Sequence, residues 1–270
     1  MNPSGNGRRS SPRARIDPTE LPRDKEELSR LLLGDDTSGL DQEVMHAILS
    51  KVDHYDETSA GQAQEEFERF RGLEEVKEEL EDIMFSLFVK QNQNFDSVLM
   101  HGPPGTGKTE IAFLLAKKSK AVFLRMNGAS FASQYQGMQE KLVQGLFSLA
   151  KICRCRLVIF IDECDGLLGK KKETNCEVNN EMKNTFLTGM SALKNRTQSP
   201  VLFIGATNHP SFLMDEVIRR FLSKLYLPIP QSLNARVAIL RDRLEGRVYS
   251  VSEPEFESLG LRMEGWSAAD

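Results

Sequence analysis

The segment from Gly102 to Thr109 reads Gly-Pro-Pro-Gly-Thr-Gly-Lys-Thr, and its residue types suit the binding of a phosphate chain. Glycines let the backbone turn tightly, so successive amide N–H groups can point at phosphate oxygens. Lys108 would place a positive charge beside the β- and γ-phosphates, and the Thr109 hydroxyl would reach Mg²⁺. The helix expected after the loop would direct its positive dipole end toward the same anions. The sequence therefore predicts a site for a nucleoside triphosphate and Mg²⁺.

A pair of carboxylates follows the apolar run Leu157–Ile161, which is typical of a central strand buried on both faces. Because the carboxyl ends of parallel strands converge beside a phosphate loop, Asp162 is predicted to bind Mg²⁺ through its water shell. Glu163 is predicted to orient and deprotonate the attacking water. Asp165 would cap or brace the turn. The alternative for Asp162 and Glu163 is that they are solvated carboxylates at a strand end without a functional role. The predicted nucleotide-binding residues are Gly102, Pro103, Pro104, Gly105, Thr106, Gly107, Lys108, Thr109, Glu110 and Asp162.

Three further residues are candidates for the same chemistry. Asn208 follows the apolar run Val201–Ile204 and could place its amide between the γ-phosphate and the lytic water. A Thr-Asn pair at a strand end is, however, usually part of a turn. Arg219 and Arg220 are ordinarily surface charge or a helix C-cap, and they gain interest only if another subunit's nucleotide lies within reach. The residues alone leave these alternatives open.

Short apolar runs alternate with helical patterns after residue 72, and this alternation predicts an α/β fold. Strands interleaved with helices favour a parallel sheet covered on both faces, here a five-stranded, three-layer P-loop sandwich. The predicted strands are Val98–Met100, Ala121–Leu124, Leu157–Ile161, Val201–Ile204 and Lys224–Leu227. The helical patterns between most of them are Glu110–Lys118, Lys141–Lys151, Glu181–Leu193 and Glu216–Leu222.

Composition predicts three parts. The N-terminal part is rich in Pro, Gly, Ser and Arg and is expected to be a disordered tail, followed by a short helix from Asp41 and a polar linker over 53–66. The apolar spacing that begins at Gly72 predicts a helix of about four turns. After Pro228 the pattern is wholly helical, which predicts the beginning of a small lid domain. The expected bounds are 1–66 for tail and linker, 67–228 for the large nucleotide-binding domain, and 229–270 for an incomplete lid.

The overall composition excludes several classes of protein. With 35 basic and 39 acidic residues among 270, the net charge of −4 gives no general reason for nucleic-acid or membrane affinity. No apolar run approaches the roughly 20 residues of a membrane span. The basic N-terminus lacks the apolar stretch of a secretory signal; it is read as a tail, with an organellar presequence as the alternative. Four cysteines without zinc-site spacing are read as reduced thiols of a cytoplasmic or nuclear protein.

These elements, taken together and in this order, resemble the AAA+ ATPases. The subgroup that fits best contains katanin, spastin, fidgetin and the vacuolar sorting ATPase that disassembles ESCRT assemblies. The resemblance covers about residues 40–270, and Leu40–Leu49 is similar to the short helix that precedes the ATPase module in that subgroup. The segments similar to signature segments or later landmarks are Phe95–Thr109, Val158–Asp165, Ile204–Pro210, Ile218–Phe221, Tyr226–Pro230 and Gly265–Asp270.

The resemblance implies a role for each candidate. Lys108 and Thr109 would bind phosphate and Mg²⁺, Asp162 would hold Mg²⁺, and Glu163 would be the catalytic base. Asn208 resembles the γ-phosphate sensor. The resemblance implies that Arg219 and Arg220 are arginine fingers, which act on ATP held by the neighbouring subunit of a ring. Such a ring is usually a homo-hexamer.

A further implied element is the central pore loop, which Ser133-Gln-Tyr-Gln-Gly137 resembles. Tyr135, Gln136 and Gly137 would then grip an unfolded polypeptide, such as a tubulin tail or an ESCRT-III subunit. As a bare pattern, the same five residues are an ordinary surface loop.

The sequence also departs from the family pattern. Arg69-Phe-Arg-Gly72 stands where Asp-Ile-x-Gly is common, although Phe70 could still lie against adenine, and His101 replaces a usual Tyr. The sequence ends at Asp270, where the lid helix over the nucleotide should start. This predicts either a fragment or incomplete gene model, or a degenerate protein with impaired nucleotide exchange and ring assembly.

Two functions are therefore weighed. The leading hypothesis is an ATP-hydrolysing remodeller that couples hydrolysis to pulling on a polypeptide. The alternative is an ATP-binding but poorly active regulatory subunit or truncated relative. A third class, the nucleic-acid P-loop ATPases, lacks support because no basic, aromatic-laced face is visible in the sequence.

Overall fold

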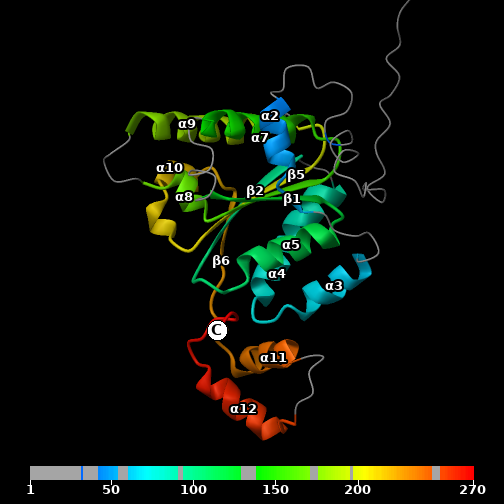
Figure 1. Cartoon of the computed structure of the whole chain (residues 1–270). Helices are drawn as coiled ribbons and strands as arrows, with labels where there is room; N and C mark the ends of the chain where they lie inside the picture. Colours follow the sequence, from blue (N-terminus) through cyan, green and yellow to red (C-terminus); the bar gives the residue numbers. More distant parts are fainter. Residues whose placement is uncertain are drawn as a thin grey trace, which may run out of the picture.

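A six-stranded sheet lies at the centre of the computed structural model, between two layers of helices (Figure 1). The strand order is β1-β3-β4-β5-β2-β6, and every neighbouring pair among the last five strands is parallel. The predicted five-stranded parallel sheet is thus confirmed, with a short antiparallel β1 added at its edge. The strands are β1 (Val52–Asp53), β2 (Phe95–His101), β3 (Val122–Asn127), β4 (Leu157–Asp162), β5 (Val201–Thr207) and β6 (Ser223–Tyr226). The structure describes residues 32, 42–53, 60–90, 94–128, 138–170, 176–194, 197–244 and 250–270.

The helices form one layer on each face of the sheet (Figure 1). One layer holds α3 (Ala60–Arg69), α4 (Glu74–Met84), the π-helix η2 (Phe85–Lys90) and α5 (Lys108–Lys118). The opposite layer holds α2 (Gln42–Leu49), α7 (Gln139–Ile152), α8 (Cys164–Leu168), α9 (Cys176–Leu193) and α10 (Asp215–Ile218). The 3₁₀ turn η3 (Pro210–Phe212) precedes α10.

Strand β4 shows why its sequence is apolar throughout. Leu157, Ile159 and Ile161 contribute to the hydrophobic cluster on the α7 and α9 side. The alternate residues Val158 and Phe160 contribute to the cluster on the α4 and α5 side. All five side chains are at most 1% exposed. Since successive side chains of a strand point to opposite faces, only a continuous apolar run can fill both cores.

The N-terminal side of this module differs from the prediction. Residues 53–66 were predicted to be a polar linker, and this is wrong for residues 60–66, because α3 begins at Ala60. Ala63 and Phe67, one helical turn apart, are fully buried, and α3 packs against α5. Among the described side chains of α3, these two residues alone form the buried apolar face. Polar and charged residues surround them, so the sequence shows no clear helical spacing of apolar residues.

We expect Phe67→Leu to lower the free energy of unfolding by about 1–1.5 kcal/mol, because the smaller side chain leaves part of a filled core site empty. The ring also lies beneath the Lys118 ammonium, whose Nζ is 4.7 Å from the ring centroid. Chemical denaturation measures the loss. Glu65→Ala, on the exposed face of the same helix, is the matched control and should change stability by less than about 0.5 kcal/mol. Equal stabilities for wild type and Phe67→Leu would show that α3 is not part of the folded unit.

Helix α10 is shorter than the predicted helix Glu216–Leu222. It ends at Ile218 because the chain then turns Phe221 into the core, where the ring is 2% exposed. The Leu222 N–H donates to the Ser97 carbonyl at 2.9 Å, which leads the chain into β6. Arg219 and Arg220 therefore lie in a turn and not within a helix.

The helical pattern after Pro228 corresponds to two helices that follow β6, α11 (Leu233–Leu244) and α12 (Glu253–Arg262). They pack against each other below the sheet in Figure 1, and the last residues return toward the large domain. Arg236, 6% exposed, joins them by donating from Nε to the Gly260 carbonyl at 2.7 Å. Within the described part of the chain, every helix is too short or too polar to span a lipid bilayer.

Candidate nucleotide-binding cleft

A cleft of about 850 Å³ opens at the carboxyl ends of the parallel strands. The loop after β2, the end of β4 and the end of β5 supply its polar wall, and residues after β6 supply the opposite wall. This convergence follows from the parallel topology, because all strand ends of one kind lie at one edge. The predicted site residues that line it are Pro104, Gly105, Thr106, Gly107, Lys108, Thr109, Glu110, Asp162, Glu163 and Asn208.

The loop after β2 meets α5 at Gly107, and only glycine fits there. Gly107 precedes the helix with φ 86°, a left-handed conformation that side chains disfavour. A Cβ atom at this position would also lie 2.3 Å from Cζ of Phe70. The glycine thus permits both the sharp turn and the close approach of the Phe70 ring. The first amides of α5 are left facing the cleft, as an anion site requires.

Lys108 is 7% exposed and its ammonium is held by the loop itself. Its Nζ donates to the carbonyl oxygens of Pro103 at 2.7 Å and Gly102 at 3.0 Å. Burial lowers the pKa of Lys108, and the Asp162 carboxylate opposes that shift. Burial, together with the Lys108 charge, lowers the pKa of His101 from its ordinary value, which favours the neutral imidazole. Lys108 is therefore the positive charge on the floor of the cleft.

Thr109 and Asp162 meet across the cleft floor. The Thr109 hydroxyl donates to Oδ2 of Asp162 at 2.9 Å, which joins the first turn of α5 to the end of β4. A hydroxyl and a carboxylate are the few protein oxygens that Mg²⁺ usually takes when phosphates and waters complete its shell. The donor set thus fits Mg²⁺, and these two side chains would hold it.

Glu163 takes an unusual backbone conformation directly after the strand. Its φ of 48° and ψ of 45° are left-handed, which is uncommon for a residue with a side chain. The Glu163 N–H donates to Oδ1 of Asp162 at 3.0 Å, and Oε2 accepts from Nδ2 of Asn127 at 3.1 Å. The strand end therefore presents one carboxylate beside Thr109 and a second one beside Asn127. Such local strain is often found at functional sites.

Asn208 lines the cleft with a polar atom that lacks a partner. Its Oδ1 is buried, and no hydrogen-bond partner is found for it among the described residues. An unsatisfied buried carbonyl is costly, so its presence beside the phosphate loop fits a ligand or water that completes it. Asp165, predicted to cap or brace its own turn, instead accepts a hydrogen bond at Oδ1 from Thr207 Oγ1 at 2.6 Å and so joins α8 to the end of β5.

Other predicted site residues lie elsewhere. Arg219 and Arg220 are exposed and do not line the cleft of their own chain. Gly102 and Pro103 contribute carbonyl groups to Lys108 but are not part of the cleft wall. The pore-loop prediction, Tyr135, Gln136 and Gly137, falls outside the described residues.

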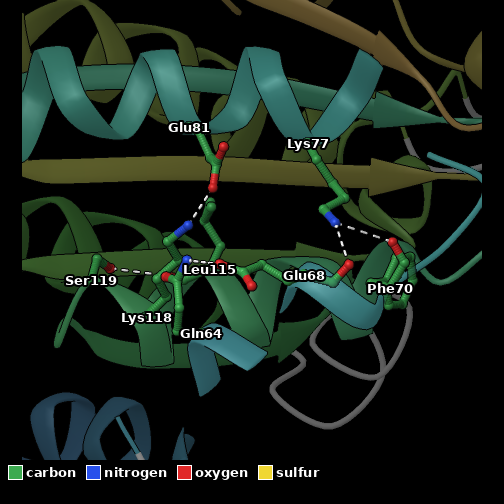
Figure 2. A network of polar contacts seen from close by, with 8 residues as sticks. All are labelled: Gln64, Glu68, Phe70, Lys77, Glu81, Leu115, Lys118 and Ser119. Carbon is green, nitrogen blue, oxygen red and sulfur yellow. Dashed lines mark hydrogen bonds and ion pairs between the residues drawn. The ribbon is translucent and has the colours of Figure 1, made fainter. Parts of the chain in front are cut away.

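A polar network holds the backbone at the end of α3, next to Phe70 (Figure 2). Lys77 of α4 donates from Nζ to the carbonyl oxygens of Glu68 at 3.0 Å and Phe70 at 3.3 Å, which holds the end of α3. Lys118 pairs with Glu81 in the same network and so joins α5 to α4. Phe70 and its neighbours from Arg69 to Leu73 form a wall of the cleft, next to Gly107.

Sequence reasoning missed two residues of the site, Arg125 and Asn127. Both lie on β3, where Asn127 is in register with Asp162 of β4. Arg125 pairs with Asp162, with its Nη2 3.6 Å from Oδ2. The apolar pattern of β3 marked it as a strand, but only the pairing of β3 with β4 places its polar residues beside the carboxylates. Alternating polar residues near the end of the strand were the available signal.

Known proteins are similar to this chain over the residues that form the sheet and the cleft. Residues 98–229 match the family model described as "ATPase family associated with various cellular activities (AAA)". The chain is 33% identical to spastin of Ixodes scapularis over 238 residues, which is 86% of this chain and 36% of spastin. It is 34% identical to vacuolar protein sorting-associated protein 4B of Mus musculus over 206 residues, 74% of this chain and 46% of that protein. Fidgetin-like protein 1 of Caenorhabditis briggsae is 33% identical over 205 residues, 74% of this chain and 34% of that protein. The chain thus spans less than half the length of these relatives.

A solved structure is similar over most of the chain. The crystal structure of the FIGL-1 AAA domain in complex with ADP superimposes with a TM-score of 0.69 at 29% sequence identity. The match covers 86% of this chain and 77% of that one. The sheet and both helical layers therefore have the arrangement of a nucleotide-binding domain.

Proposed function

We propose that this chain, which carries an ATPase domain of the AAA family, binds ATP with Mg²⁺ in the cleft and hydrolyses the bond between the β- and γ-phosphates. The observation that supports this most is the meeting of Lys108, the Thr109–Asp162 pair and Glu163 in one cleft. A phosphate-binding cation, oxygen ligands for a divalent ion and a carboxylate base are the groups that such hydrolysis needs.

Each residue has a separate task in this reaction. Lys108 and the first amides of α5 bind the phosphate oxygens, and Thr109 and Asp162 hold Mg²⁺, which supplies neutralisation of phosphate charge when bound. Glu163 accepts a proton from a water molecule, whose oxygen forms the new bond to the γ-phosphorus. The bond to the bridging oxygen breaks, giving ADP and inorganic phosphate. Asn208 orients that water and the γ-phosphate through its amide.

We place the arginine pair at a subunit interface. Arg219 and Arg220 are exposed and lie outside the cleft of their own chain, so any nucleotide they serve belongs to a neighbouring copy. A head-to-tail contact of this kind closes into a ring when the rotation allows it, and the proposed ring is a homo-hexamer. The proposed work of the ring is remodelling of a polypeptide, such as a tubulin tail or an ESCRT-III-like subunit, drawn through the pore by Tyr135. We locate it in the cytoplasm or nucleus.

Shared active sites predict a rescue when two inactive variants are mixed. Glu163→Gln removes the base but keeps the arginines, and the double replacement Arg219→Ala/Arg220→Ala does the reverse. At equal amounts, about a quarter of head-to-tail interfaces combine an intact base with intact arginines. We therefore expect steady-state ATPase activity to recover to about a quarter of the wild-type value. A mixture of two Glu163→Gln preparations is the control, and no recovery at any mixing ratio would argue against shared sites.

A second candidate function is an ATP-binding regulatory subunit with little turnover. The observation that favours it is the hydrogen bond from Asn127 to Oε2 of Glu163, because a donor on one of the two carboxylate oxygens makes the carboxylate a weaker base. The effect of Glu163→Gln on ATP turnover separates the two.

A further inference from the structure

We propose that Arg125 reads the terminal phosphate of the nucleotide held by its own chain, so that the cleft distinguishes ATP from ADP without a neighbouring subunit. The proposal rests on the proposed function of the cleft. It assigns a specificity-determining role to a residue that lies outside both the phosphate loop and the exposed arginine pair.

Strand geometry carries Arg125 into the cleft. Phe123, two residues earlier on β3, contributes to the core on the α5 side, and Arg125 shares its face because side chains alternate along a strand. Leu124 and Met126, on the other face, are buried. The Arg125 backbone is fixed by a hydrogen bond from its N–H to the Lys51 carbonyl of the loop before β1, at 3.1 Å. Its side chain thus leaves the sheet on the side of the phosphate loop and lines the cleft.

The charge contact of Arg125 is with the predicted Mg²⁺ ligand. Its Nη2 lies 3.6 Å from Oδ2 of Asp162, the oxygen that also accepts the Thr109 hydroxyl. The Arg125 side chain is 49% exposed and that of Asp162 is 23% exposed, so the pair is held weakly and can separate. The backbone of Arg125 is therefore fixed beside Asp162, while its guanidinium can exchange this carboxylate for another anion.

A divalent ion on Asp162 changes the balance of charge around Arg125. Asp162 would hold Mg²⁺, and the positive charge of that ion would repel the Arg125 guanidinium and weaken its ion pair with Asp162. The anions that remain in this part of the cleft are the Glu163 carboxylate and the γ-phosphate, and a guanidinium is a preferred partner of phosphate. ADP lacks that group, so the new contact exists only with a triphosphate.

The other arginines in the cleft wall are placed differently. Arg69 and Arg71 flank Phe70 at the end of α3. Arg243 of α11 donates to the Ala268 carbonyl at 3.4 Å. Arg125, by contrast, forms an ion pair with Asp162 at the phosphate end of the cleft.

Isothermal titration calorimetry in the presence of Mg²⁺ tests this proposal without relying on turnover. The ligands are ADP and the non-hydrolysable ATP analogue with an imido group between the β- and γ-phosphates. We expect Arg125→Ala to weaken binding of the analogue about tenfold or more, since hydrogen bonds to charged groups are strong, and to change ADP binding less than about twofold. Arg125→Lys should keep part of the preference, because it retains the charge but not the planar fork.

Arg154→Ala is the matched control, because Arg154 lies outside the cleft wall, and it should bind both ligands like the wild type. The inference is overturned if Arg125→Ala weakens or strengthens both ligands equally, or leaves both unchanged. Failure of the wild type to bind either nucleotide would instead remove the proposed function, and this inference with it. The two failures are therefore distinguishable by which protein shows them.

Discussion

Replacing Glu163 with glutamine is expected to lower steady-state ATP turnover about a hundredfold, which is a typical contribution of a general base. The amide cannot accept the proton of the attacking water, but its size and its position after β4 are kept. Lys108 and the Thr109–Asp162 pair are untouched, so ATP should still bind. The measurement is the phosphate released at saturating ATP, together with direct titration of ATP binding.

Glu257→Gln is the control for this experiment, since Glu257 is exposed on α12, outside the cleft wall. It should turn over ATP at the wild-type rate. Equal and low rates for the wild type and Glu163→Gln would favour the ATP-binding regulatory subunit over the hydrolase. If Glu163→Gln turned over ATP at the full wild-type rate, Glu163 would not be the catalytic base.

Replacing Lys108 with alanine is expected to weaken ATP binding by about two orders of magnitude or more. The reason is that the phosphates lose their contact with the positive charge of a largely buried ammonium group. The ammonium lies on the cleft floor, held by two carbonyls of its own loop. These carbonyls would be left without their donor, so some loss of stability should accompany the loss of affinity. Titration with ATP, alongside thermal unfolding of the free protein, measures the two effects separately.

Lys141→Ala provides the matched control for Lys108, because Lys141 is an exposed lysine of α7 outside the cleft wall. It should bind ATP with wild-type affinity. If Lys108→Ala folds and binds ATP as tightly as Lys141→Ala does, the loop after β2 is not the phosphate site.

The parts of the fold that could be predicted from the sequence are those set by local pattern. The apolar run of β4 and the glycines before Lys108 each carry their own physical reason, so the central strand and the loop follow directly. Helix α3 has too narrow an apolar face to show its period, and its burial against α5 depends on tertiary contact. The early end of α10 depends on Phe221 finding a core site across the sheet.

The candidate site divides in the same way. Residues in one motif, such as Lys108 and Thr109, were accessible to sequence reasoning. Asn127 and Arg125 were not, because their role depends on the register between β3 and β4, which joins segments about 35 residues apart. The roles of Arg219 and Arg220 require a second copy of the chain, so they stay predictions.

An experimental structure of the protein with the imido analogue of ATP and Mg²⁺ would show directly where the triphosphate binds. The triphosphate should lie along the loop from Gly102 to Thr109, with Lys108 on its terminal oxygens. Mg²⁺ should lie beside Thr109 and Asp162, with Glu163 facing the γ-phosphate. Nucleotide bound elsewhere, or a loop whose lysine makes no phosphate contact, would contradict the proposed function.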